Sequence, residues 1–408
     1  MSTVVISPHS ATKFLDRAGN FWVYLQYALG LQAVGCDVHW LERLEPPGPG
    51  WEGVDASLTE QTRLLAETLS RFGISNKPIL YTSESERGEP FRPTYIGVTA
   101  GEAEKTFKRA ELLLNFHQQI HPELLAQVRR TALVDIDPGL LQYWISSGQL
   151  QVPDHDVYFT IGETVGTPAA TFPDCGIDWV HIPPPVFLGQ WPFSPRSDAA
   201  PFTTVSSWHG HEYILEGDGF WDNNKRVSWL RFIELPKLTD QPLELATFFG
   251  HKDASDRLDL ERNGWRVRHA PDVADTAERY RSYVQSSRGE ISCAKPSCMR
   301  FQNAWISDRT LCYLASGKPA VVQDTGPSSN LPDGSGLHRF STAEEAAAAI
   351  GAVNAAYDRN CRAAREIAES LFDATRVATR ILERALGSDA RRAVGLVAPP
   401  RASQSARA

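Results

Sequence analysis

Two series of short apolar segments, separated by one proline-rich stretch, constrain the fold of this chain more than any other feature. The first series runs from residues 3–7 to 178–182, and the second from 202–208 to 318–324. Helix-like sequence lies between several of the segments, and such alternation is typical of parallel, doubly wound sheets. The sequence therefore predicts an α/β protein with two Rossmann-like domains that face each other across a cleft.

A chain of 408 residues is too long for one core of ordinary size, so two domains are expected. The proline-rich stretch sets the boundary between them. We expect an N-terminal domain over 1–185, a linker over 186–201 and a C-terminal domain over 202–365. A helix over 366–387 is expected to pack back on the N-terminal domain. The tail over 388–408 is rich in Arg, Ala, Ser and Pro, which predicts disorder.

Charge and cysteine content exclude several classes of function. The formal net charge is −8, so no basic surface for nucleic acid is expected. The first ten residues do not resemble a signal peptide, and no run of about 18 apolar residues occurs, so we expect a cytoplasmic protein without a membrane span. The six cysteines form no CxxC pair, which argues against a structural zinc site and favours reduced thiols.

Ligands of open parallel sheets bind beyond the carboxyl ends of the strands, so polar residues at those positions are candidate contacts. In the N-terminal domain the candidates are His9, Asp16, Asn20, His117, Asp137 and Glu163. In the C-terminal domain they are Trp208, Lys225 and Lys295. Each has a structural alternative: a loop hydrogen bond for the histidines, a helix cap for Asp137, a core position for Trp208, and solvated surface for the lysines.

The segment from Ser307 to Gly326 carries the strongest local signal. Ser307 is a suitable N-cap, and the free N–H groups and dipole of the helix that follows predict an anion site at 307–309. Arg309 would add a guanidinium for phosphate oxygens, and Asp308 could accept from ribose hydroxyls. The next strand delivers Asp324, Thr325 and Gly326 to the same edge, where glycine allows close approach to a ligand. The alternative is an ordinary capped helix followed by a turn.

Two groups have the spacing of metal ligands, but neither makes a complete site. Asp135 and Asp137 form a DxD pair, with residue 135 expected inside a strand. His209, His211 and Glu212 include alternate residues that would share one strand face, but no fourth ligand is evident. We therefore expect no metal.

Several segments together resemble glycosyltransferases of the GT-B fold, in a bacterial group related to the GT4-like (family 4/1-like) enzymes. They are GNFWVYLQYALGL (19–31), AK (294–295), WISDR (305–309), CYLASGKPAVVQDTG (312–326) and LPDGSGLHRFSTAEEA (331–346). The resemblance extends from about residue 15 to residue 350. It implies a nucleotide-diphospho-sugar donor on the C-terminal domain, an acceptor (a small molecule, lipid or glycan) on the N-terminal domain, and no further cofactor or metal.

Retaining members of that family carry two glutamates with seven residues between them, at positions that correspond here to Ala304 and Cys312. A retaining mechanism is therefore not carried over, and Asp308 is the expected substitute for the ribose contact. In an inverting reaction His9 or Asp16 would take the acceptor proton, while the 307–309 turn with Lys225 or Lys295 would stabilise the leaving diphosphate. A sugar-nucleotide epimerase or hydrolase, and a non-catalytic sugar-nucleotide-binding protein, are the competing interpretations.

Overall fold

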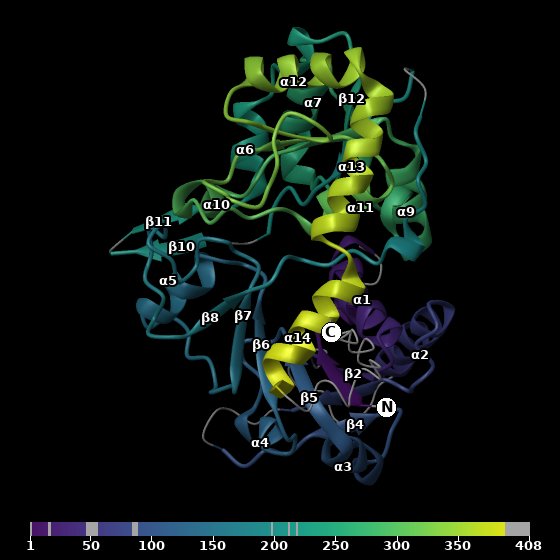
Figure 1. The fold of residues 1–408 in the computed structure, drawn as a ribbon, viewed down its shortest axis with the longest axis vertical. Coiled ribbons are helices and arrows are strands. Elements are labelled where there is room, and N and C mark those ends of the chain that lie inside the picture. Colours follow the sequence, from purple (N-terminus) through teal and green to yellow (C-terminus); the bar gives the residue numbers. More distant parts are fainter. Residues whose placement is uncertain are drawn as a thin grey trace, which may run out of the picture.

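The computed structural model describes residues 2–14, 18–45, 56–83, 89–196, 199–210, 213–217 and 219–387. It consists of two α/β lobes, each built on one mainly or wholly parallel sheet, with a smaller hairpin between them (Figure 1). The fold class expected from the alternating pattern is therefore confirmed. The tail over 388–408, for which disorder is expected, lies outside the described residues.

The first lobe contains an eight-stranded sheet in the order β4-β3-β2-β1-β5-β6-β7-β8. Its strands are β1 (Thr3–Ser7), β2 (Asp37–Arg43), β3 (Ile79–Thr82), β4 (Thr94–Ile96), β5 (Ala110–Asn115), β6 (Thr131–Asp135), β7 (Val157–Thr160) and β8 (Trp179–His181). All neighbours are parallel except β3 and β4. The central β1 is buried at every residue, which its apolar sequence TVVIS requires.

The helices of the first lobe flank this sheet. They are η1 (Thr12–Phe14), α1 (Ala18–Ala33), α2 (Ala56–Arg71), α3 (Ala100–Arg109), α4 (Pro122–Leu125) and α5 (Leu140–Ser146). Helix α3 begins with a capping box, in which Thr99 and Glu102 satisfy each other's backbone N–H groups. Helix α1 is buried on most of its circumference, since it packs against both lobes.

The second lobe contains a six-stranded parallel sheet in the order β13-β12-β9-β14-β15-β16. Its strands are β9 (Phe202–Val205), β12 (Leu243–Thr247), β13 (Arg266–His269), β14 (Gly289–Ser292), β15 (Ala320–Gln323) and β16 (Leu337–Phe340). Its helices are α6 (Lys225–Arg231), η3 (Leu235–Leu238), η4 (His251–Asp253), α7 (Ala254–Arg262), α8 (Pro271–Ala274), α9 (Ala277–Ser286), α10 (Pro296–Phe301), α11 (Asp308–Ala315), α12 (Ala343–Ala355) and α13 (Tyr357–Leu371).

Two strands form an antiparallel hairpin apart from both large sheets: β10 (Tyr213–Glu216) and β11 (Gly219–Asp222). The hairpin leaves the second lobe and lies against α5 of the first lobe (Figure 1). The Tyr143 hydroxyl donates to the Leu215 carbonyl at 2.6 Å, and Leu140, Ile214 and Phe301 share a buried cluster. The hairpin therefore joins the two lobes.

The chain crosses between the lobes twice, and the two crossings pair with each other. The first includes η2 (Leu188–Gln190), and the second joins α13 to α14 (Ala374–Leu386). Val186 N–H donates to Phe372 O at 2.7 Å, and Ala374 N–H donates to Val186 O at 3.0 Å. Helix α14 then packs on α1 and β5 of the first lobe, where it is the yellow helix of Figure 1.

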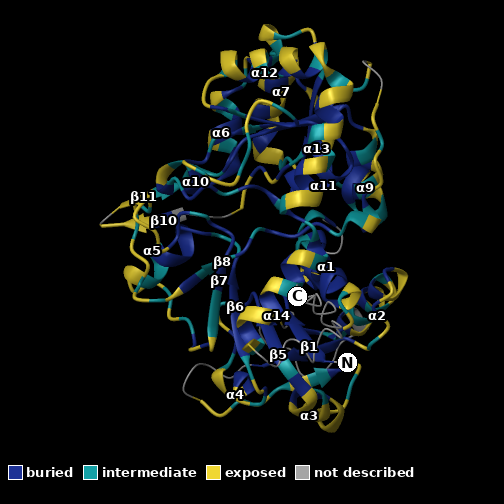
Figure 2. Cartoon of the chain, in the orientation of Figure 1, coloured by how far each residue is buried: buried dark blue, intermediate teal, exposed yellow. Residues whose placement is uncertain are grey.

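Apolar burial joins the lobes as well as filling them. Figure 2 shows both sheets buried and the outer helix faces exposed. Trp22 of α1 is 1% exposed, lies against Trp191, and donates from its indole to Ala277 O of the second lobe at 3.0 Å. Burying one large apolar side chain of this kind stabilises a fold by about 1.5–3 kcal/mol. No helix within the described ranges is both long and apolar enough to cross a membrane.

Candidate functional site

Two histidines meet at the carboxyl ends of neighbouring strands. His9 follows β1 and His117 follows β5, and these strands pair in parallel. Their rings stack with centroids 4.9 Å apart and planes at 19°. The Asn115 side-chain oxygen accepts from the His117 N–H at 2.9 Å, and the Tyr24 hydroxyl donates to His9 O at 3.2 Å. The strand-end rule therefore brings together two residues that are 108 positions apart in the sequence.

The protein surroundings favour the neutral form of both rings. Burial, together with the neighbouring His9 and Arg43, lowers the pKa of His117 to about 3. His9 is more exposed, and its partial burial lowers its pKa from the usual value, with Glu45 and Asp137 acting in the opposite direction. A neutral imidazole can accept a proton, so His9 has the state that a general base requires.

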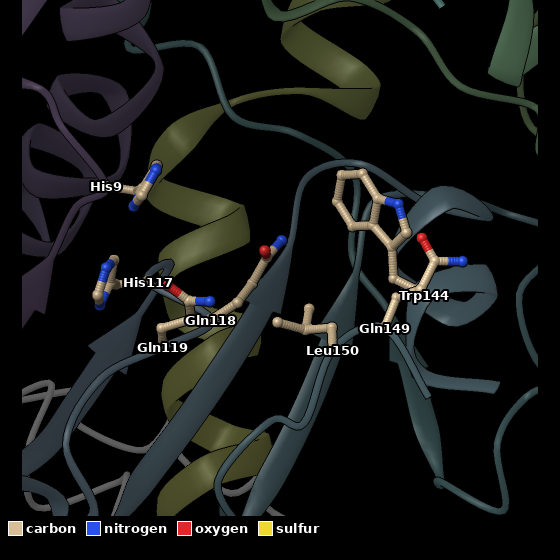
Figure 3. A pocket seen from close by; sticks show the side chains of 7 residues that line it. All are labelled: His9, His117, Gln118, Gln119, Trp144, Gln149 and Leu150. Carbon is tan, nitrogen blue, oxygen red and sulfur yellow. The ribbon is translucent and has the colours of Figure 1, made fainter. Parts of the chain in front are cut away.

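A pocket of about 300 Å³ opens beside this histidine pair. It is lined by His9, His117, Gln118, Gln119, Trp144, Gln149 and Leu150. Figure 3 shows the two histidines on one side and Trp144 with Gln149 on the other, with Gln118 between them. The histidines were expected here, whereas Trp144 and the glutamines were not, because the sequence does not show that α5 closes this side of the pocket.

Asp137 lies at the end of the next strand and reaches the other lobe. Its Oδ1 is 3.6 Å from Nζ of Lys295. The turn is held by the buried Asp135, which accepts from Asp137 N–H, Gln142 Nε2 and Thr160 Oγ1 at 2.9–3.0 Å; burial raises the pKa of Asp135 to about 7. Asp137 is not the cap of α5, since Gly139 occupies that position.

The DxD pair is therefore a structural turn, with residue 135 inside β6 as expected. No group of three or more metal-ligating side chains occurs in the part of the chain that the structure describes. His209 instead pairs with Asp253 at 2.8 Å. The other two members of that motif, His211 and Glu212, lie outside the described residues.

Lys225 and Lys295 form a cationic pair at the cleft edge of the second lobe. Lys225 begins α6 and is 9% exposed, and its Nζ lies 5.9 Å from the centre of the Trp305 ring. No described residue forms a hydrogen bond or ion pair with this ammonium group. Burial, together with the charges of Arg309 and Lys295, lowers the pKa of Lys225 to about 7, against the raising effect of Asp308. An anion from outside the chain would relieve this arrangement.

Ser307 is the N-cap of α11, as expected, and its Oγ accepts from the Arg309 N–H at 3.3 Å. Burial raises the pKa of Asp308, against the lowering effect of Arg309 and Lys225. The cavity beside this turn has a volume of only about 10 Å³, which is room for one water molecule.

Arg309 does not present its guanidinium to the cleft, which corrects the expected phosphate contact. Its side chain is 7% exposed; Nε binds Glu290 Oε1 at 2.7 Å and a terminal nitrogen donates to Val205 O at 3.0 Å. Glu290 lies in the buried strand β14, so it holds the arginine inside the lobe. A glutamate within a strand that is buried at every residue requires a buried cationic partner, and Arg309 supplies it.

Trp208 is a core residue, so the expected stacking on a nucleotide base is corrected as well. It is 1% exposed, lies in the hydrophobic core of the second lobe, and donates from Nε1 to Asp256 Oδ2 at 3.1 Å. The partly exposed Trp305, which follows α10, is the indole that lies beside Lys225 instead.

The residues after β15 contact the chain itself. Asp324 pairs with Arg339 at 3.1 Å, and Thr325 Oγ1 donates to Trp305 O at 2.6 Å. Gly326 has φ of +125°, and a Cβ there would lie 2.6 Å from Gln302 O. The close approach that requires glycine is therefore between two chain segments, not between backbone and ligand, which corrects that expectation.

Glu163 also differs from its expected contact with substrate. Its carboxylate accepts from Ser329 N–H and Ser329 Oγ, each at 2.7 Å, and from Ser328 Oγ, all in the second lobe. It therefore closes the lobes on each other. Asn20 lies in the first turn of α1 and is partly exposed, while Asp16 lies outside the described residues.

Comparisons with known proteins show similarity in structure only. No protein-family model matches the sequence, and no curated protein matches it. Sucrose-phosphate synthase from Thermosynechococcus elongatus is 12% identical, with a TM-score of 0.52 over 93% of this chain and 97% of that chain. AviGT4, a glycosyltransferase involved in avilamycin A biosynthesis, is 14% identical, with a TM-score of 0.51 over 97% of this chain and 99% of that chain.

HepE from Anabaena, in complex with UDP and glucose, is 11% identical, with a TM-score of 0.51 over 94% of this chain and 99% of that chain. These likenesses extend over both lobes and the crossings between them. The chain therefore has the GT-B fold, as its sequence resemblance implied.

Proposed function

We propose that this chain, which has the GT-B fold, is a glycosyltransferase that moves a sugar from a nucleotide-diphospho-sugar to an acceptor hydroxyl or another nucleophile. The observation that carries the proposal is the buried ammonium group of Lys225, which forms no hydrogen bond or ion pair with a described residue, although Asp308 is near enough to act against the lowering of its pKa. An unpaired buried cation is costly, and a diphosphate would supply the missing negative charge.

The donor diphosphate would lie between Lys225, Lys295 and the N-terminus of α11. The two lysines would neutralise the charge that develops on the leaving diphosphate, and the α11 dipole adds to this effect. The proposal thus assigns charge neutralisation to side chains and requires no metal ion. The cavity at Ser307 has a volume of only about 10 Å³, and Lys295 is paired with Asp137 of the first lobe. Entry of the donor therefore requires the lobes to move apart.

The acceptor would bind on the first lobe, where His9 faces the pocket with a neutral ring. No described residue forms a hydrogen bond with the His9 ring nitrogens, so one of them can take the proton of the attacking hydroxyl. This assignment gives an inverting reaction, consistent with Ala304 and Cys312 at the positions of the two glutamates. Asp16 is the alternative base.

The test is a thermal-shift screen of wild-type protein with UDP, dTDP, GDP and ADP. Because a ligand of the folded state raises its melting temperature, one nucleotide should do so, and Lys225→Met should abolish the shift. Lys237→Met is the matched control, since Lys237 is an exposed lysine paired with Glu234. The proposal fails if no nucleotide shifts the wild type, or if the Lys225 variant shifts equally.

Turnover assays with the matching sugar nucleotide then separate the competing activities. Transfer gives a product only when an acceptor is present, hydrolysis or epimerisation consumes the donor without one, and a non-catalytic protein binds without turnover. Either of the last two outcomes would replace the proposed transfer reaction.

A further inference from the structure

We propose that the pocket beside the histidine pair binds an uncharged saccharide ring, with Trp144 against one face of the ring and Gln118 and Gln119 on its hydroxyl groups. As an assignment of the acceptor, the inference rests on the proposed function. As an assignment of a binding site, it rests on the pocket alone.

The size of the pocket suits a small polar ligand. Its volume of about 300 Å³ is at the small end of ligand pockets, which begin at about 300 Å³. Leu150 is its one aliphatic lining residue. A long alkyl chain would find little apolar surface here, so the pocket does not favour the tail of a lipid acceptor.

The hydrogen-bonding groups of the pocket are largely uncommitted. Among the described residues no hydrogen-bond partner is found for the side chains of Gln118 and Gln119, the indole N–H of Trp144 or the ring of His9. Nδ1 of His117 is fully buried and also has no partner within the described ranges. Amides and imidazoles both donate and accept, which matches a row of sugar hydroxyls.

The charge of the pocket argues against an anionic ligand. None of the seven lining residues is Asp, Glu, Lys or Arg, and the surroundings favour the neutral form of both histidines. A phosphate or carboxylate would therefore lose its hydration without gaining a counter-charge. A neutral polyol pays no such penalty, because its hydroxyls exchange water for amide and imidazole partners.

Trp144 supplies an apolar plane in this otherwise polar pocket. It is partly exposed and lies across the pocket from His9 (Figure 3). The C–H-bearing face of a pyranose packs well on an aromatic ring, while its edge stays free for hydrogen bonds. The neighbouring Tyr143 ties α5 to Leu215 of the hairpin at 2.6 Å, so the plane is held in place before a ligand binds.

The experiment is saturation-transfer NMR on the full chain without nucleotide, using methyl pyranosides of glucose, galactose, mannose, rhamnose and N-acetylglucosamine. At least one should receive saturation through its ring protons. Trp144→Leu should weaken its binding at least about tenfold, and Gln118→Leu about three- to tenfold. Lys237→Met is the control, because this exposed lysine of the second lobe does not line the pocket and its replacement should leave saccharide binding unchanged.

Two arms separate this inference from the proposed function and from a lipid source. The octyl glycoside of the bound sugar should bind as the methyl glycoside does, since no alkyl channel is expected. Lack of binding by every methyl glycoside, binding unaffected by both pocket variants, or at least tenfold tighter octyl binding would overturn the saccharide assignment. If a nucleotide raises the melting temperature but no saccharide binds, the transferase proposal stands and the saccharide assignment fails. If a saccharide binds but no nucleotide raises the melting temperature, the saccharide assignment stands and the transferase proposal fails.

Discussion

The Asp137 carboxylate of the first lobe lies 3.6 Å from the Lys295 ammonium of the second. The charge of Asp137 also acts against the lowering of the His9 pKa by burial, so Asp137 affects both the proposed base and the proposed diphosphate site. A donor phosphate that binds Lys295 would therefore compete with Asp137 for this lysine.

Replacement of these partners should therefore have opposite effects on nucleotide affinity. Asp137→Asn should lower the Kd several-fold, because its carboxylate no longer competes with phosphate for Lys295 or repels it, whereas Lys295→Met should raise it about tenfold. Isothermal calorimetry measures both. The pair is partly exposed, so each change should alter the free energy of unfolding by no more than about 1 kcal/mol. Equal affinities in all three proteins would contradict the competition.

Nucleotide binding should depend on pH through Lys225. The pKa of this group is lowered to about 7, so it is charged below that pH and neutral above it. A bound diphosphate favours the charged form and raises the pKa, so binding above pH 7 takes up a proton. Affinity should fall up to about tenfold per unit between pH 7 and 9.

Calorimetry in buffers of different ionisation enthalpy would detect this proton uptake at pH 8. Lys225→Met should bind weakly at every pH and take up no proton at this site. A flat pH profile of the wild type over this range would show that Lys225 does not contact the nucleotide.

His9→Gln should lower kcat about 10²–10⁴-fold while the Kd for nucleotide stays within about twofold, because a general base acts on the chemical step. The pKa of His9 lies below its usual value, so wild-type kcat should be constant above pH 7 and fall as pH decreases through that pKa. Stopped assays across pH 5–8 measure the profile. If His9→Gln keeps both the wild-type kcat and its decrease at acidic pH, His9 is not the base. Asp16→Asn is then the next variant to test.

The buried pair of Arg309 and Glu290 should be important for stability rather than for direct binding. Arg309→Met leaves the Glu290 carboxylate buried and should lower the free energy of unfolding by about 3–5 kcal/mol. Adding Glu290→Leu should recover most of this loss, since both charges are then absent. Urea denaturation of both variants and of the wild type measures these changes. If Arg309→Met instead weakened nucleotide binding in a stable protein, the guanidinium would be the phosphate contact that its sequence position suggests.

Much of the fold could be predicted because long apolar runs such as 110–116 and 318–324 mark strands directly. The strands β3 and β4 and the β10–β11 hairpin could not, since they lie toward the edge of a sheet or outside the large sheets. Their pairing depends on neighbours that are brought in by tertiary structure.

The candidate site was predictable where chain topology alone places a residue, as with His9, His117, Asp137 and Lys295. It was not predictable where packing decides which way a side chain points. Arg309 turns inward because Glu290 is buried in the adjacent strand, and Trp208 because Asp256 accepts its indole N–H. Trp144 and Gln118 line the same pocket only after α5 folds against the sheet, and no local sequence pattern indicates that arrangement.

Gly30 tests the packing that holds the C-terminal helix on the first lobe. A Cβ at this position of α1 would lie 2.5 Å from the carbonyl oxygen of Ala374, where α14 begins. Gly30→Ala should therefore lower the free energy of unfolding by about 1–3 kcal/mol, because backbone must move to admit the methyl group. Gly101→Ala in α3 is the matched control: nothing lies within 4 Å of its added Cβ, so the helix should gain about 0.5–1 kcal/mol. Urea denaturation of both variants would show opposite signs, and equal stabilisation would mean that α14 does not pack closely on α1.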